Sequence, residues 1–82
     1  MNQAIHFPDR EQWDESKQAV CFPVLVHGMQ LTCAVSGETL KRRFGGSNPL
    51  EVFCENRWDL EEEASELIRD QQEDDQGWVW LS

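Results

Sequence analysis

The sequence predicts an α+β fold in which a small antiparallel sheet carries two or three helices packed on one face. Residues 19–26 and 29–35 are rich in Val, Phe, Leu and Thr and flank His27-Gly28, a pattern typical of a β-hairpin. Apolar residues at helical spacing follow helix-capping residues between positions 36 and 72. Because 82 residues hold only one core, residues 1–82 are expected to form a single compact domain.

The N-terminal part predicts one short strand and an aromatic anchor. Ile5-His6-Phe7 alternates in polarity and would add an N-terminal strand, which Pro8-Asp9 would end. The segment Asp9–Lys17 is polar apart from Trp13, so we expect a turn or one helical turn that returns the tryptophan to the body of the domain.

A two-residue loop at His27-Gly28 fixes the register of the hairpin. Val26 then faces Met29, and the pairs continue outward to Val20 opposite Val35. One face of the hairpin is wholly apolar and is expected to lie under the helices: Val20, Phe22, Val24, Val26, Met29, Leu31, Cys33 and Val35. The other face carries Ala19, Cys21, Pro23 and Leu25 against Ser36, Ala34, Thr32 and Gln30.

Pro23 tests this register, because proline lacks the backbone donor that a central ladder needs. In the predicted hairpin it lies opposite Thr32 at a non-hydrogen-bonded site, so its nitrogen points away from the partner strand. We therefore expect strand 19–26 to be an edge near Pro23, or to be paired only beyond it, whereas strand 29–35 is free to be central.

Two helical segments follow the hairpin. Ser36 is a good N-cap, and Gly45-Gly46 ends a helix of about two turns whose last turn is basic. Ser47 or Asn48 precedes Pro49, the arrangement expected at a second helix start. This helix is predicted from Pro49 to Gln72. Arg57 interrupts its apolar stripe, so the helix either kinks there or restarts at Asp59, with Glu62 completing a capping box.

The final strand, Trp78-Val79-Trp80-Leu81, is apolar at every position. Val79 and Leu81 are expected to join the core under the helices, which leaves Trp78 and Trp80 on the other face of the sheet. If the segment around Trp13 does not cover them, they form an aromatic patch suited to a protein partner or a homodimer.

Charge is distributed unevenly along the chain. Of the net charge of −9, none comes from residues 1–46, with five acids and five bases, whereas residues 47–82 hold eleven acids and two bases. This excess opposes direct nucleic-acid binding and favours a basic protein partner. The candidate protein-binding residues on the helix are six acids, which we call the acidic row: Asp59, Glu62, Glu63, Glu66, Asp70 and Glu73.

The sequence offers little chemistry for catalysis. We find no nucleophile-base pair, glycine-rich phosphate loop or metal-ligand spacing, and therefore predict no catalytic residue, metal or cofactor. Cys21 and Cys33 lie on opposite hairpin faces and cannot bridge, so free thiols are expected. An odd cysteine number, with no apolar leader or membrane-spanning run, predicts a cytoplasmic protein that does not enter a membrane.

Four segments resemble a known family: Asn2–Arg10, Gly28–Ala34, Arg57–Ala64 and Asp74–Leu81. They are similar to the YrdB-like family of small bacterial proteins of unknown function, and the resemblance covers nearly the whole chain. It implies a compact α+β domain in the bacterial cytoplasm and no established activity, so no residue role is carried over from the family.

The function itself is not predicted by these observations. They favour a non-enzymatic protein-interaction module that acts through the acidic row or the Trp78/Trp80 face. An acidic nucleic-acid mimic or regulator that acts through a basic protein is the alternative, and a small enzyme is less favoured.

Overall fold

The sheet is built around the predicted hairpin. A computed structural model describes residues 5–82, and in it β3 (Ala19–Val26) pairs antiparallel with β4 (Met29–Ser36). The predicted register is confirmed from Val26 opposite Met29 to Ala19 opposite Ser36. His27 and Gly28 both have positive φ, of 52° and 82°, as a type I′ turn requires. Residues Asn2–Ala4 of the family-like opening lie outside the described residues.

The outer edge of β3 is shared by two short strands. β1 (Ile5–His6) pairs with Val26 and Leu25, and β2 (Gln12–Asp14) pairs with Cys21, Val20 and Ala19. The interval between them is centred on Pro23, so the prediction that this strand is an edge near its proline is confirmed, and the strand is paired on both sides of that point. The prediction of a turn or helical turn for Asp9–Lys17 is wrong for residues 12–14, which form β2, whereas residues 15–18 form a turn and Trp13 packs against the core as predicted.

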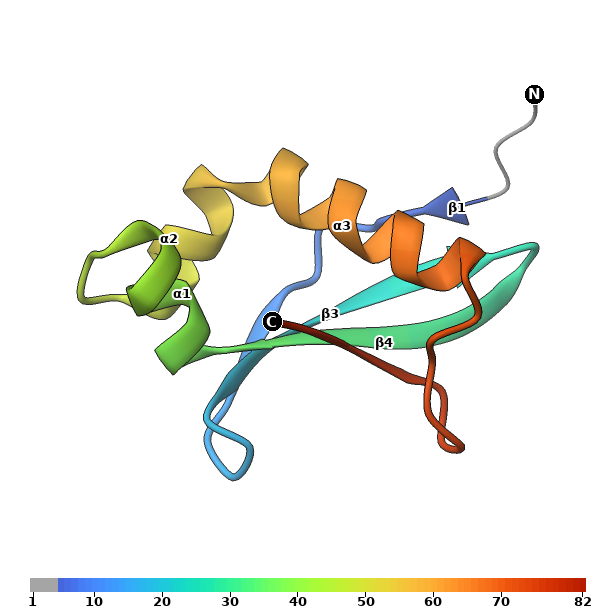
Figure 1. The fold of residues 1–82 in the computed structure, drawn as a ribbon, viewed down its shortest axis with the longest axis horizontal. Coiled ribbons are helices and arrows are strands. Elements are labelled where there is room, and N and C mark those ends of the chain that lie inside the picture. The colour runs from blue at the N-terminus through green and yellow to red at the C-terminus, as the bar shows by residue number, and fades with distance from the viewer. Residues whose placement is uncertain (1–4) are drawn as a thin grey trace.

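The sheet is mixed rather than antiparallel, which corrects the prediction. Its order is β1-β3-β4-β5, and β5 (Trp78–Leu81) runs parallel to β4. Parallel neighbours need a crossover connection, and the three helices provide it on one face of the sheet (Figure 1). The predicted α+β class, with helices on one face, is confirmed.

Local capping sets the three helices. α1 (Gly37–Phe44) begins where Ser36 Oγ accepts a hydrogen bond from the Thr39 amide at 3.0 Å. α2 (Pro49–Glu55) begins with the Asn48 side chain accepting from two amides, at 3.1 and 3.2 Å.

The long predicted helix is broken at Asn56, and α3 (Arg57–Arg69) is a separate element. Asn56 Nδ2 donates to the carbonyl of Val52 at 2.9 Å, and this contact satisfies the end of α2. The second helix thus begins two residues before Asp59, and no side-chain hydrogen bond caps its start, so the predicted capping box is absent.

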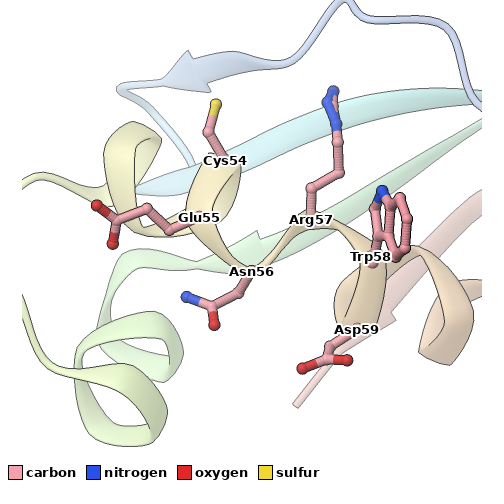
Figure 2. Close-up of a pocket in the computed structure, with 6 residues that line it drawn as sticks. All are labelled: Cys54, Glu55, Asn56, Arg57, Trp58 and Asp59. Carbon is pink, nitrogen blue, oxygen red and sulfur yellow. The ribbon is translucent and has the colours of Figure 1, made fainter.

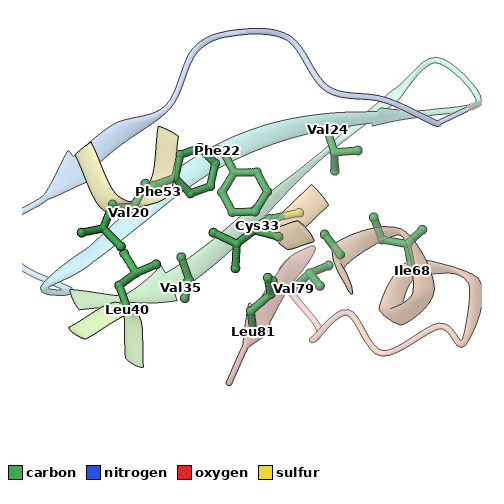
Figure 3. Close-up of a cluster of buried hydrophobic side chains, with 13 residues drawn as sticks. Val20, Phe22, Val24, Cys33, Val35, Leu40, Phe53, Ile68, Val79 and Leu81 are labelled. Carbon is green, nitrogen blue, oxygen red and sulfur yellow. The ribbon is translucent and has the colours of Figure 1, made fainter. Parts of the chain in front are cut away.

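The core lies between the sheet and the helical layer (Figure 3). Phe22 packs against Phe53 of α2 with ring centroids 4.7 Å apart. Five of the eight predicted hairpin residues are buried, and Val26 and Leu31 are half-buried. Met29 is 63% exposed, contrary to the prediction, because it lies at the hairpin tip, which projects past the end of α3 (Figure 1).

Within residues 5–82, none of the helices has the length and apolar character needed to cross a membrane.

Candidate functional site

The sheet face turned away from the helices is the first candidate. We call it the open face and define it by Cys21, Pro23, Leu25, Thr32, Trp78 and Trp80. The parallel pairing of β5 places Trp78 beside Thr32 and Trp80 beside Ala34. The two indole rings stack, with centroids 6.0 Å apart and planes 19° apart.

Trp80 remains 45% exposed on this face, whereas Trp78 is half-buried. Lys17 reaches over Trp78, with Nζ 4.9 Å from the ring centroid, so the lysine covers one indole and leaves the other open to solvent. Ala34, which pairs with Trp80, is fully buried. The two tryptophans therefore cover part of the sheet face that has no helices.

Trp13 does not cover the tryptophan pair, so of the two alternatives that the sequence left open, the uncovered pair is the one in the structure. It pairs with Val20, whose side chain is on the helical face, and its ring lies against Gly37. A methyl group built on Gly37 would lie only 3.0 Å from the Trp13 ring, so this close contact is available because position 37 is glycine.

The acidic row is less uniform than the sequence predicts. Asp59, Glu62 and Glu66 are exposed on α3. Glu63 instead forms a salt bridge with Arg43 of α1, and one of its hydrogen bonds is 3.0 Å long. The helix ends at Arg69, so Asp70 is its C-terminal cap and Glu73 lies in the following loop. These two acids thus extend the row beyond the helix.

An ionic cluster that sequence reasoning missed surrounds the largely buried Arg57 side chain. The Arg57 side chain is only 17% exposed and lies over the Phe53 ring, 5.2 Å from its centroid. It binds Glu11 from the segment before β2, Glu61 one turn along α3 at 3.4 Å, and Asp9 at 3.6 Å. The cluster ties the segment between β1 and β2 to the helical layer. The interruption of the apolar stripe by Arg57 was its signal in the sequence.

The two glutamates of the Arg57 cluster have opposite pKa shifts. The hydrogen bond from its own backbone amide is the main cause that lowers the pKa of Glu11, and contacts with Cys54 and Arg57 act in the same direction. Burial is the main cause that raises the pKa of Glu61, although Arg57 opposes it. Glu11 is thus the carboxylate that the fold favours in its charged form.

A surface pocket of about 360 Å³ lies where α2 gives way to α3. Figure 2 shows Cys54 and Arg57 pointing to the same side, toward the segment between β1 and β2. Cys54 Sγ donates a hydrogen bond to Glu11 at 3.3 Å. Trp58 also lines this pocket and is 84% exposed, the second residue that sequence reasoning missed.

All three cysteines are free, as predicted. Burial is the main cause that raises the pKa of each thiol, and it brings that of Cys33 to about 12. Protonated thiols are poor nucleophiles, so these side chains do not suit covalent catalysis. Across the described residues, no group of three or more His, Cys, Asp or Glu side chains is arranged to hold a metal ion.

Comparison with known proteins gives consistent matches over the whole chain. The model of the family described as "Protein of unknown function (DUF1488)" matches residues 5–81. The chain is 68% identical to "Uncharacterized protein YrdB" of Escherichia coli (strain K12) and to the protein of the same name in Shigella flexneri. Each match covers 99% of both chains.

A solved structure has the same fold. The crystal structure of a protein of unknown function of this family, from Shewanella loihica PV-4, superimposes with a TM-score of 0.91 at 30% sequence identity. The match covers 99% of this chain and 94% of the other. The chain therefore belongs to the DUF1488 family, and the YrdB-like resemblance seen in its sequence is confirmed.

Proposed function

We propose that the chain is a non-enzymatic protein-interaction module that binds through the open face. The observation that carries this proposal is the stacked Trp78–Trp80 pair, in which Trp80 is 45% exposed. The free face of an antiparallel pair is normally polar, yet here Pro23, Leu25 and two indoles share it. Exposed apolar patches of this kind mark protein interfaces, and tryptophan often supplies much of the binding energy.

The remaining chemistry agrees with a binding role. The raised pKa of the thiols argues against a cysteine nucleophile. The free cysteines also fit a reducing compartment, so we place the protein in the cytoplasm as part of the same proposal.

The test compares two single variants in affinity capture. We expect Trp80→Ala to lose the partners that the wild-type chain retains, because the exposed indole would be removed from the interface. Met29→Ala is the control, since Met29 is also a large exposed apolar residue but lies at the hairpin tip, outside the open face. Circular dichroism must show that both variants are folded. Equal capture by wild type and Trp80→Ala would contradict the proposal.

A second candidate surface is favoured by the exposure of Trp58. This indole stands at the start of α3 beside Asp59 and Glu62, which are also exposed. An aromatic residue next to carboxylates suits a basic protein partner, whose arginine or lysine side chains can contact both. This surface corresponds to the alternative of an acidic nucleic-acid mimic, and its binding would weaken with salt.

A further inference from the structure

We propose that the partner of the open face is a basic protein segment that places an arginine side chain over Trp80. This inference rests on the proposed function, because it names the chemistry of the partner for the same surface. Three observations support it: the charge at the borders of the face, a cation that the face already holds, and the protected edge of β5.

The charge around the open face is negative and comes from its borders. β3, β4 and β5 carry no Asp, Glu, Lys or Arg, whereas residues 12–18 and 73–77 hold five acids and one base, a net charge of −4. In Figure 1 the turn at 15–18 and the loop at 73–77 extend beyond the sheet on the side opposite the helices. A cationic partner is therefore attracted to this side of the sheet, and an anionic one is repelled.

The loop at 73–77, which we call the acidic loop, is fixed beside the tryptophan pair. Asp74 Oδ1 accepts a hydrogen bond from the amide of Trp78 at 2.9 Å, and the amide of Asp74 donates to the carbonyl of Trp78 at 2.8 Å. Glu73 and Asp75, on either side of Asp74 in the chain, are exposed. Trp80 follows two residues along β5, about 7 Å away, so these carboxylates lie near a long side chain that rests on its indole.

The open face already holds one cation. Lys17 Nζ lies over the Trp78 ring at the distance of a cation–π contact. Trp80 stacks beside Trp78, and within residues 5–82 no lysine or arginine lies over its ring. The lysine contact indicates that the tryptophan pair suits a cation, and Trp80 offers a second position of the same kind to a partner.

The edge of β5 is protected against pairing with a partner strand. β5 is the last strand in the order of the sheet, so its outer side is an edge. At Trp78, however, both the amide and the carbonyl are bonded to Asp74. A strand added at this edge would have to displace that contact. We therefore expect the partner to contact the indoles from the face, through its side chains.

Arginine fits this arrangement better than lysine. Its guanidinium group is planar, so it can lie flat on an indole while its N–H groups bind a carboxylate. Glu73 and Asp75 supply such carboxylates beside the tryptophan pair. The ammonium group of lysine is a compact point charge and does not match this pair of contacts.

An NMR titration with a hexa-arginine peptide tests this inference. The four indole N–H signals can be assigned with single Trp→Phe variants, and they report on different surfaces. We expect the signals of Trp78 and Trp80 to shift as peptide is added, whereas those of Trp58 on α3 and of Trp13, which is bonded to Glu15, should stay in place. Shifts confined to Trp58 would overturn the inference in favour of the second candidate surface.

Two double variants separate the acidic loop from the overall charge. Glu73→Gln with Asp75→Asn should weaken peptide binding roughly 5-fold, because two exposed carboxylates beside the indoles are lost. Glu62→Gln with Glu66→Gln removes the same charge from α3 and should change the affinity by less than about 2-fold. Asp74 is left unchanged because it holds the loop in place. Equal losses in the two variants would mean that the peptide senses only net charge, and the inference would be wrong.

Lys17→Gln should have the opposite effect. This change uncovers Trp78 for a second arginine and removes a competing cation, so the peptide should bind roughly 3-fold more tightly or better. Arg42→Gln removes the same charge from an exposed position of α1 and should leave the affinity within about 2-fold of wild type. Weaker binding by the Lys17→Gln variant would contradict the proposed position of the arginine.

The indole itself and the peptide provide the last comparison. Trp80→Ala should weaken binding of hexa-arginine roughly 10-fold, since the cation–π contact is lost, whereas Met29→Ala should not. Hexalysine should bind the wild-type chain at least about 3-fold more weakly than hexa-arginine. Equal affinity for the two peptides would overturn the choice of arginine. Circular dichroism must show that each variant is folded.

The outcomes separate this inference from the proposed function. If hexa-arginine shifts neither open-face indole but Trp80→Ala still loses its captured partners, the open face binds a partner of different chemistry, and only this inference is wrong. If the peptide shifts neither indole and Trp80→Ala captures the same proteins as wild type, both are wrong.

Discussion

At the scale of single residues, Arg57 holds the helical layer to the segment between β1 and β2. A guanidinium group that is mostly buried needs several acceptors, and Glu11, Glu61 and Asp9 provide them from two separate parts of the chain. In the sequence, such a residue is visible only as a charged position that interrupts the apolar stripe of a helix. Its partners at Asp9 and Glu11 could not be predicted, since they depend on the placement of a segment that has little periodicity of its own.

The opposite pKa shifts around Arg57 predict opposite effects of two conservative substitutions. The pKa of Glu11 is lowered from 4.5 in the folded state, so its stabilising contribution is present above that pH and is lost as the pH falls. Glu11→Gln should therefore reduce the free energy of unfolding at pH 7, by about 1 kcal/mol or less, and have little effect near pH 3.

Glu61→Gln should instead raise the free energy of unfolding at pH 7. The pKa of Glu61 is raised from 4.5, so its contribution is present below that pH and is lost as the pH rises, which makes the charged form a cost at pH 7. Urea unfolding at both pH values measures these differences, with Glu62→Gln as the exposed control. If the Glu11 and Glu61 variants shift stability in the same direction at pH 7, our description of the cluster is wrong.

At the scale of elements, capping and turn residues were readable from the sequence, whereas strand direction was not. Ser36, Asn48 and the His27-Gly28 turn act through contacts within a few residues, so their roles were correctly predicted. The direction of β5 depends on where the helical layer returns the chain. The strand 12–14 was missed for a related reason. It is a strand because it pairs with residues 19–21 of β3, and its own sequence does not show this pairing.

The acidic row allows a prediction about α3 as an element. Glu62, Glu66 and Asp70 follow one another at intervals of four, and Asp70 also lies at the negative end of the helix dipole. The combined change to Gln, Gln and Asn should raise the free energy of unfolding, by about 0.5–1 kcal/mol at low salt. The gain should shrink in 1 M salt, where charges are screened.

Glu63→Gln is the matched control for this variant. Its carboxylate pairs with Arg43, so the same chemical change one position away should lower stability instead. Urea unfolding of the combined variant and of Glu63→Gln, at low salt and in 1 M salt, measures both changes in stability. If the combined variant is less stable than wild type, the acids of the row have partners that we have not identified. Weaker binding of a basic protein to the folded variant would support the second candidate surface.

At the scale of the whole molecule, the sequence predicted the α+β class and the side of the hairpin that is buried, because an alternating pattern has only two possible orientations. The sequence could not show whether the tryptophan pair is covered. That depends on Trp13, which packs under the helices and leaves the pair uncovered. Which face a single aromatic residue covers follows from strand pairing over the whole sheet and not from local spacing.

The parallel placement of β5 has a consequence for the order of folding. Trp78 pairs with Thr32, 46 positions earlier, whereas the hairpin closes over two residues. Closing the longer loop costs roughly 3 kcal/mol more in chain entropy, so β5 should dock last and open first. We expect the amide protons of Val79 and Leu81 to exchange with deuterium sooner than those of Phe22 and Val24. Equal rates would show that β5 opens only with the whole domain. Because both open-face tryptophans belong to this last strand, the surface that we propose for binding would be complete only at the final step of folding.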